Sequence, residues 1–209
     1  GYRPQANAAP IKETLAAALC DLARLRPYHT LYDPMCGSGT ILIEGAMMVH
    51  NIAPGVNRYF SAERWDVIDE KVWTDERNRA RDLVNYDTDF IAYGSDIDEE
   101  ALEIAKINAK RAGVERKIKF EKADIRNFEP KSEKGTVICN PPYGERLLDI
   151  EKAQKLYKIM GEKFIKKHGW SYYVISPSEE FEKEFGRKAD KRRKLYNGMI
   201  KCQLFMYFK

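Results

Sequence analysis

The sequence predicts an α/β fold in which a doubly wound, mostly parallel sheet ends in an antiparallel hairpin. Three observations support this fold class. Apolar runs of strand length alternate with amphipathic segments of helix length through most of the 209 residues. The turn Gly37-Ser38-Gly39 joins the first of these runs to a helical segment. Near the end of the chain, Asn197-Gly198 separates two strand-like runs, which is typical of a hairpin.

The expected elements alternate in type along the chain. A first helix is expected over 15–25, where apolar residues recur at helical spacing. Five strands follow, each with a helix after it, and Ser178 can cap the short last helix. The strands are 30–33, 91–95, 117–121, 136–139 and 170–175, the longer helices are 40–49, 98–112 and 151–167, and the hairpin strands are 191–196 and 203–208. Five β-then-α units before an antiparallel pair predict a Rossmann-like sheet.

One stretch interrupts the alternation. Residues 51–90 are too many for a simple connection, and 69–84 within them could form a helix. We therefore expect one domain over 1–209 with an insertion at about 51–90. The insertion interleaves basic and aromatic side chains, namely Arg58, Arg64, Arg77, Arg79 and Arg81 with Tyr59, Phe60, Trp65 and Trp73. The arginines slightly favour a nucleic-acid contact, whereas the tryptophans are better explained by packing.

Composition excludes several classes of protein. The net charge of +4 permits a nucleic-acid partner without requiring one. No apolar run is long enough to cross a bilayer, and the first residues lack the apolar segment of a secretory signal. The polar start, close to the first apolar helix, suggests a piece of a longer protein. The four widely spaced cysteines and three histidines predict no zinc site and no disulfide framework, so we expect reduced thiols and a cytoplasmic location.

The strongest local signal is the segment Asp33-Pro34-Met35-Cys36-Gly37-Ser38-Gly39-Thr40, where a buried strand enters a glycine turn and a helix. The free N–H groups at that helix start could hold a phosphate or a carboxylate. The spacing of the dinucleotide-binding fingerprint is not met. Asp33 would also repel a pyrophosphate, whereas it would attract the ammonium and sulfonium of S-adenosylmethionine. The cofactor contacts expected here are Asp33, Pro34, Cys36, Gly37, Ser38, Gly39 and Thr40.

Acidic residues also end the next two strands. Asp96-Ile97-Asp98 follows the second strand, and Asp96 could accept both ribose hydroxyls of the cofactor. Asp124-Ile125 follows the third strand, and Asp124 could accept the adenine amino group. Taken singly, Asp96 could be a helix N-cap and Asp124 a turn residue. Acids at the ends of three successive strands favour one nucleoside site, and the terminal hairpin is typical of the methyltransferase version of this fold.

The most specific motif is Asn140-Pro141-Pro142-Tyr143, directly after the fourth strand. An exocyclic amine of a base is a poor nucleophile because its lone pair is delocalised into the ring. The Asn140 side-chain oxygen and the Pro141 carbonyl could accept its two hydrogens and orient the nitrogen toward the methyl group. Tyr143 offers a face for stacking, worth about 1–3 kcal/mol per base. A target base paired in a duplex would have to be flipped out.

With these motifs in view, the chain resembles the catalytic domain of the THUMP-associated RNA guanine-N2 methyltransferases, and most of all the bacterial enzymes that act on 23S ribosomal RNA. The resemblance extends to Gly1-Tyr2-Arg3, to 9–15, to Ile41-Leu42-Ile43-Glu44 and to Gly144-Glu145-Arg146-Leu147 after the catalytic tetrapeptide. It implies methyl transfer from S-adenosylmethionine to the N2 amine of guanine. It also implies that Pro10 and Ile11 lie against the methionine end of the cofactor. Family members carry an RNA-binding THUMP domain before this one, and we expect that domain to be absent from these 209 residues.

Several alternatives stay open. Relatives methylate transfer RNA, and the same tetrapeptide serves adenine-N6 methylation of DNA or RNA and glutamine-N5 methylation of protein. A non-catalytic RNA-binding module that keeps only the fold is another alternative, against which the intact tetrapeptide argues. A basic cluster precedes the hairpin turn, namely Arg187, Lys188, Lys191, Arg192, Arg193 and Lys194. It fits a phosphate-backbone contact or a solvated edge strand about equally.

Overall fold

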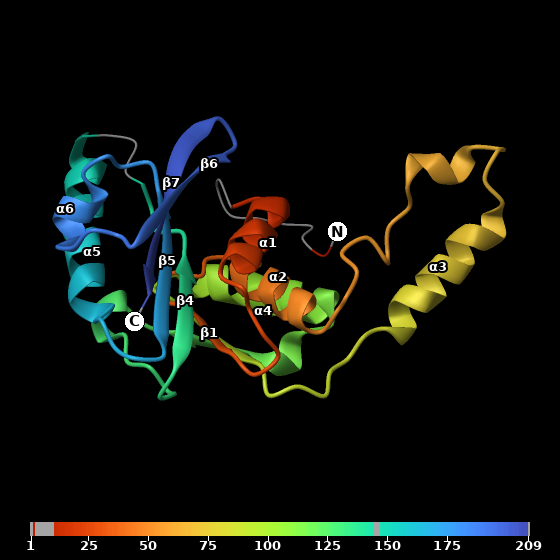
Figure 1. Cartoon of the computed structure of the whole chain (residues 1–209), viewed down its shortest axis with the longest axis horizontal. Coiled ribbons are helices and arrows are strands. Elements are labelled where there is room, and N and C mark those ends of the chain that lie inside the picture. The colour runs from red at the N-terminus through yellow and green to blue at the C-terminus, as the bar shows by residue number, and fades with distance from the viewer. Residues whose placement is uncertain (1, 3–10, 144–146, 209) are drawn as a thin grey trace.

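A computed structural model describes residue 2, residues 11–143 and residues 147–208, and its centre is a seven-stranded sheet (Figure 1). The strand order is β3-β2-β1-β4-β5-β7-β6. Five strands are parallel: β1 (Thr30–Asp33), β2 (Ile91–Asp96), β3 (Ile118–Lys122), β4 (Gly135–Cys139) and β5 (Trp170–Ser176). The hairpin strands β6 (Lys191–Asn197) and β7 (Ile200–Phe208) are antiparallel, and β7 pairs with β5. The predicted fold class is confirmed.

Helices cover both faces of the sheet, as a doubly wound order requires. On one face lie α1 (Glu13–Leu22), α2 (Thr40–Val49) and α4 (Glu99–Ala112), and on the other α5 (Leu147–Lys163) and α6 (Phe181–Phe185) (Figure 1). Gly113 ends α4 in the left-handed conformation, as its sequence position predicts. None of the helices in the described part of the chain is long and apolar enough to span a membrane.

Besides shifts of up to three residues at the ends of other elements, three details differ from the sequence prediction. Only a 3-10 turn, η3 (Ile125–Asn127), lies between β3 and β4, so the third β-then-α unit has no α-helix. Helix α5 begins four residues before the predicted 151 and ends four before the predicted 167. It ends early because the apolar spacing is lost after Phe164, and Ile165 is exposed. Ser178 does not cap α6, because its N–H donates to Ser176 Oγ and the N-cap position belongs to Glu180.

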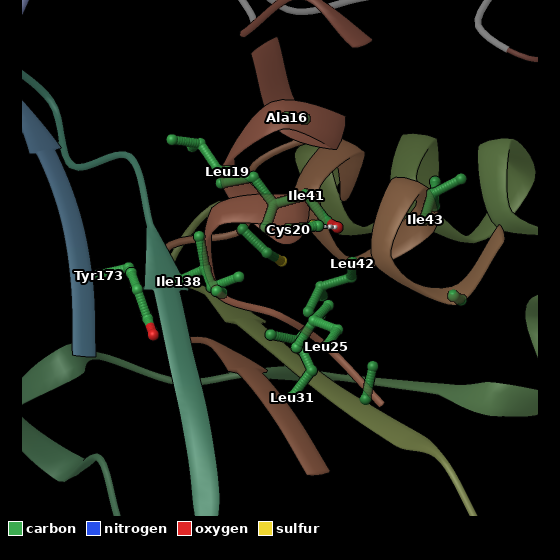
Figure 2. Close-up of a cluster of buried hydrophobic side chains, with 14 of the residues drawn as sticks. Ala16, Leu19, Cys20, Leu25, Leu31, Ile41, Leu42, Ile43, Ile138 and Tyr173 are labelled. Carbon is green, nitrogen blue, oxygen red and sulfur yellow. Dashed lines mark hydrogen bonds between the residues drawn. The ribbon is translucent and has the colours of Figure 1, made fainter. Parts of the chain in front are cut away.

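The larger apolar cluster joins α1 and α2 to the middle of the sheet. Figure 2 shows Leu19 and Cys20 of α1 in one cluster with Leu42 of α2 and Leu31 of β1, and all four are fully buried. The close approach of α2 depends on Gly45, where a Cβ would lie 2.8 Å from Leu31 Cδ2. This packing fixes α2 directly behind β1, and therefore fixes the turn between them.

The insertion forms an arm that projects away from the sheet (Figure 1). It contains η1 (Ser61–Arg64) and α3 (Glu70–Asp82), neither of which has a buried residue. Its internal contacts include the Arg77–Glu63 ion pair at 2.6 Å and the stacked rings of Phe60 and Trp73. Residues 51–90 hold six basic and nine acidic side chains, a net charge of −3. The arginines therefore give this arm no net positive charge, so the expected contact with nucleic acid stays a prediction.

Candidate active site

A cleft of about 1130 Å³ opens at the carboxyl ends of the parallel strands, where open α/β sheets bind ligands. It brings together nearly all the site residues predicted from the sequence. Those that line it are Ile11, Asp33, Pro34, Cys36, Gly37, Ser38, Thr40, Asp96, Ile97, Asp98, Asp124, Ile125, Asn140, Pro141, Pro142 and Tyr143. Gly39 lies behind the lining, and Pro10 falls outside the described residues.

Two glycines with positive φ shape the turn between β1 and α2. Gly37 has a φ of 50°, and Gly39, the N-cap of α2, has a φ of 79°. A Cβ on Gly39 would lie 3.0 Å from Ala105 Cβ, so this glycine lets α2 and α4 pack closely. The turn therefore presents Gly37, Ser38 and the start of α2 to the cleft.

Asp96 holds this turn in place from the neighbouring strand. Its Oδ2 accepts a hydrogen bond from the Gly37 N–H at 2.8 Å, and its Oδ1 accepts one from the Asp98 N–H at 3.0 Å. The N-cap of α4 is Asp98, whose side chain accepts from the N–H groups of Glu100 and Ala101. The alternative that Asp96 is itself a helix N-cap is therefore wrong.

Asp33 is the most perturbed carboxyl group of the cleft. Its side chain is only 2% exposed, and burial raises its pKa to about 8, with the Asp96 charge adding to the rise and a hydrogen bond from the Met35 N–H opposing it. Without a cation beside it, Asp33 is therefore mostly protonated at neutral pH. A cationic ligand beside this carboxyl would favour its ionised form.

The two cysteines that flank the cleft have no ionised thiol. Burial raises the pKa of both Cys36 and Cys139 well above the ordinary range, and the nearby Asp33 charge adds to each rise. A thiol that stays protonated is a poor nucleophile. Chemistry in this cleft therefore has to come from other groups.

Asp124 combines the two roles weighed for it from the sequence. It lines the cleft, and it also caps η3 by accepting a hydrogen bond from the Arg126 N–H at 2.8 Å. Hydrogen bonds from the Arg126 side chain, at 3.0 and 2.6 Å, lower the pKa of its carboxyl to about 2. The carboxylate is thus ionised and tied to the turn on one side of the cleft.

The tetrapeptide leaves β4 at the opposite wall of the cleft. Tyr143 Oη donates a hydrogen bond to Asn140 Oδ1 at 2.5 Å, and Asn197 Nδ2 of the hairpin donates to Tyr143 Oη at 3.2 Å. Burial, with the nearby Cys202 thiol, raises the pKa of Tyr143, so its hydroxyl stays a donor. A carboxamide oxygen has two lone pairs, and Oδ1 therefore keeps one for another donor.

Sequence reasoning missed two walls of the cleft. Helix α5 contributes Lys152, Lys155 and Leu156, and the hairpin contributes Asn197 and Ile200. The helical period of 151–167 could predict that α5 has a buried face. It could not predict that the first turns of the helix would line the cleft. Asn197 carried only a turn signal, and its contact with Tyr143 depends on a pairing of distant segments.

Comparisons with known proteins agree with this geometry. The family model "UPF0020: RMKL-like, methyltransferase domain" matches residues 1–205. Two curated relatives are the "Putative RNA methyltransferase YpsC" of Bacillus subtilis (strain 168) and the "Ribosomal RNA large subunit methyltransferase K/L" of Shewanella sp. (strain W3-18-1). The first is 44% identical, covering 100% of this chain and 54% of the relative. The second is 40% identical, covering 99% and 30%.

Two solved structures share the architecture across the whole chain. "SMU.472, a putative methyltransferase complexed with SAH" is 44% identical with a TM-score of 0.91. "A predicted N6-adenine-specific DNA methylase from Listeria monocytogenes str. 4b F2365" is 47% identical with a TM-score of 0.92. Each match covers 100% of this chain and 54% of the other. The chain thus spans about half, or less, of the length of these four proteins. The family model covers nearly all of it, which confirms the resemblance drawn from the motifs: the chain belongs to the UPF0020 family of RMKL-like methyltransferase domains.

Proposed function

We propose that this chain transfers a methyl group from S-adenosylmethionine to the exocyclic N2 amine of a guanine in RNA, with large-subunit ribosomal RNA as the substrate. The observation that carries the proposal is the placement of Asn140-Pro141-Pro142-Tyr143 in the same cleft as Asp33 and Asp96. The ribosomal substrate is supported by the name of the Shewanella relative. Such a substrate would place the reaction in the cytoplasm.

The cleft fits a cofactor that is cationic at one end and a nucleoside at the other. Asp33 and the turn at Gly37 and Ser38 would hold the ammonium and carboxylate of the methionine part, with Pro10 and Ile11 against it. Asp96 would accept the ribose hydroxyls. Asp124, Ile97 and Ile125 would border the adenine. A cofactor seen as S-adenosylhomocysteine in a solved relative supports this assignment.

The residues around the tetrapeptide would position the substrate amine. When bound, the cofactor supplies an electrophilic methyl group on a good leaving group. Asn140 Oδ1 and the Pro141 carbonyl would accept the two amine hydrogens and hold the nitrogen in line with that methyl. Tyr143, anchored through its hydroxyl to Asn140 and Asn197, would present its ring to the base. No strong general base is required, because the proton can leave after the methyl has been transferred.

Adenine-N6 methylation is the second candidate, because the tetrapeptide suits either amine and the Listeria structure carries that description. Transfer RNA is an alternative substrate for the guanine reaction. The two amines make the same demand on Asn140 and Pro141, so the geometry of the cleft supports both. Guanine is favoured by the family resemblance and by the ribosomal relative.

The deciding experiment uses radiolabelled S-adenosylmethionine and protein-free 23S RNA from cells that lack the enzyme, with nucleosides separated after digestion. Label in N2-methylguanosine supports the proposal, whereas label in N6-methyladenosine would mean that the target base is adenine. The control is Asn140→Ala, which should lower transfer by on the order of 10²–10³-fold, as loss of one positioned polar group does. Calorimetric affinity for S-adenosylhomocysteine should stay near the wild-type value. A wild-type chain that binds cofactor but labels no RNA would overturn the RNA assignment.

A further inference from the structure

The positive charge of this chain is concentrated in strand β6, the hairpin turn and the few residues before β6. Residues 186–201 hold seven lysines and arginines and one acidic residue, a net charge of +6. The whole chain has a net charge of +4, so the rest of it is slightly negative. A local field of one sign on a chain of otherwise balanced charge indicates an anionic partner at that place.

Four of these cations are exposed on the outer strand of the sheet, and we name three of them the basic edge: Lys191, Arg193 and Lys194. None of the three has an ion pair within the described part of the chain. Their neighbour Arg192 differs, because it pairs with Glu182 and lies over the Phe205 ring. The basic edge is therefore free to bind an external anion, while Arg192 stabilises the fold.

The basic edge leads directly into the cleft. Strand β6 ends at Asn197, which lines the cleft and donates to Tyr143 Oη at 3.2 Å. Side chains alternate along a strand, so Lys191, Arg193 and Asn197 share one face of β6. Lys194 lies on the other face, over the Tyr196 ring. At about 3.3 Å per residue, the edge extends roughly 20 Å outward from Asn197. An extended polymer lying along it would enter the cleft at Tyr143.

We propose that the basic edge docks an RNA strand through its phosphates, so that a nucleotide beyond the docked segment reaches Tyr143 and Asn140. The choice of RNA rests on the proposed function. The edge contributes three exposed cations, and the exposed apolar side chains of the hairpin, Tyr196, Met199 and Ile200, follow it toward the turn. A row of cations along an edge strand suits a phosphate backbone. The chain thereby carries its own RNA-binding element next to the reacting centre, whatever further domain a longer protein supplies.

The test compares two triple variants of matched composition. The edge variant is Lys191→Ala, Arg193→Ala and Lys194→Ala. The control is Arg111→Ala, Lys166→Ala and Lys167→Ala, which removes the same residue types from exposed positions that have no ion pair in the described chain. Arg111 lies in the last turn of α4, and Lys166 and Lys167 follow the end of α5, at the edge of the sheet opposite the cleft. Circular dichroism and S-adenosylhomocysteine affinity verify that both variants stay folded.

The probe is a fluorescein-labelled RNA stem–loop with guanines in its loop, titrated by anisotropy at several salt concentrations. Each phosphate contact contributes about 0.7 to the slope of log affinity against log salt for a single strand. The edge variant should therefore lower that slope by about 2 and weaken binding at low salt, while the control keeps the wild-type slope. Equal slopes in all three proteins, or equal losses in both variants, would overturn the proposal. Equal slopes in all three proteins would instead indicate that an acidic protein binds the basic edge.

Methyl transfer separates this proposal from the proposed function. A wild-type chain that binds RNA with the expected slope and loses it in the edge variant, yet transfers no methyl, overturns the function and keeps the docking edge. In the opposite case, the wild type methylates RNA and the edge variant binds and methylates RNA equally well. That result overturns the docking edge and keeps the function. A wild-type chain without measurable RNA affinity overturns the docking edge as well.

Discussion

Cofactor affinity should depend on pH through Asp33, because burial raises the pKa of its carboxyl to about 8. Binding an ammonium group next to Asp33 requires the ionised form. Below pH 8 the proton has to leave first, and each pH unit costs about 1.4 kcal/mol, or tenfold in affinity. Above about pH 8 the α-amino group of the cofactor loses its own proton. Affinity should therefore peak near pH 8 and fall on both sides.

The assay is calorimetric titration with S-adenosylhomocysteine between pH 6 and 9, in buffers of different ionisation enthalpy. Near pH 7 binding should release most of one proton. The matched variant Asp33→Asn keeps the size of the side chain and lacks the titrating proton. It should lose the acid limb of the profile and keep the alkaline one. A wild-type affinity that is flat from pH 6 to 8, with no proton released, would refute the assignment of Asp33 to the ammonium.

The same group makes a prediction about stability, whose sign follows from its raised pKa. Below the unfolded pKa of 3.8 the carboxyl is protonated in both states and costs nothing. Between pH 3.8 and about pH 8 the Asp33 carboxyl is ionised only in the unfolded state, so the stability of the fold decreases as pH rises. The accumulated cost reaches on the order of 5 kcal/mol near pH 8. Asp33→Asn should therefore be more stable than the wild type at pH 8 and equally stable at about pH 3.5, as measured by denaturant unfolding. A stability difference that does not change with pH would contradict this explanation.

Two further substitutions test the turn and the packing behind the cleft. Asp96→Ala removes the acceptor of the Gly37 N–H and should weaken S-adenosylhomocysteine binding at least about tenfold in calorimetry, as loss of a charged hydrogen bond does; unchanged affinity would remove Asp96 from the site. Gly161→Ala should destabilise the chain, because the new Cβ would lie 1.9 Å from the Phe185 carbonyl oxygen. Overpacking of about 1–3 kcal/mol or more should outweigh the helix-propensity gain of about 1 kcal/mol. The measurement is urea unfolding followed by far-UV circular dichroism. An equal free energy of unfolding in the variant and the wild type would contradict this prediction.

The sequence could predict the sheet and most of the cleft lining because both depend on local patterns. Strand β1 and helix α2 have the bounds expected from the apolar run and the glycine turn. Strand ends are predictable, and parallel strands align their ends, so Asp33, Asp96, Asp124 and Asn140 had to meet at one edge. The sequence did not predict that a 3-10 turn replaces the helix after β3. This turn is stabilised by contacts between Asp124 and Arg126, which helical periodicity does not reveal.

Contacts between distant segments account for what the sequence did not predict. The anchoring of Tyr143 by Asn197 joins positions 54 residues apart and requires the β5–β7 pairing to bring the hairpin to the cleft. The arm shows a different limit. Its arginines suggested a nucleic-acid surface, but their meaning depends on which acids they meet, as Arg77 meets Glu63 and Arg79 meets Glu76.

The projecting arm also determines what a fluorescence experiment on this protein reports. Two of the three tryptophans, Trp65 and Trp73, belong to the arm, and only Trp170 is buried beside the sheet. An element without buried residues can open with a much smaller free energy than the core. Tryptophan emission would then follow the opening of the arm, while far-UV dichroism follows the sheet and its helices. Two unfolding curves that fail to coincide would reveal an independent appendage, and would not indicate a partly folded core.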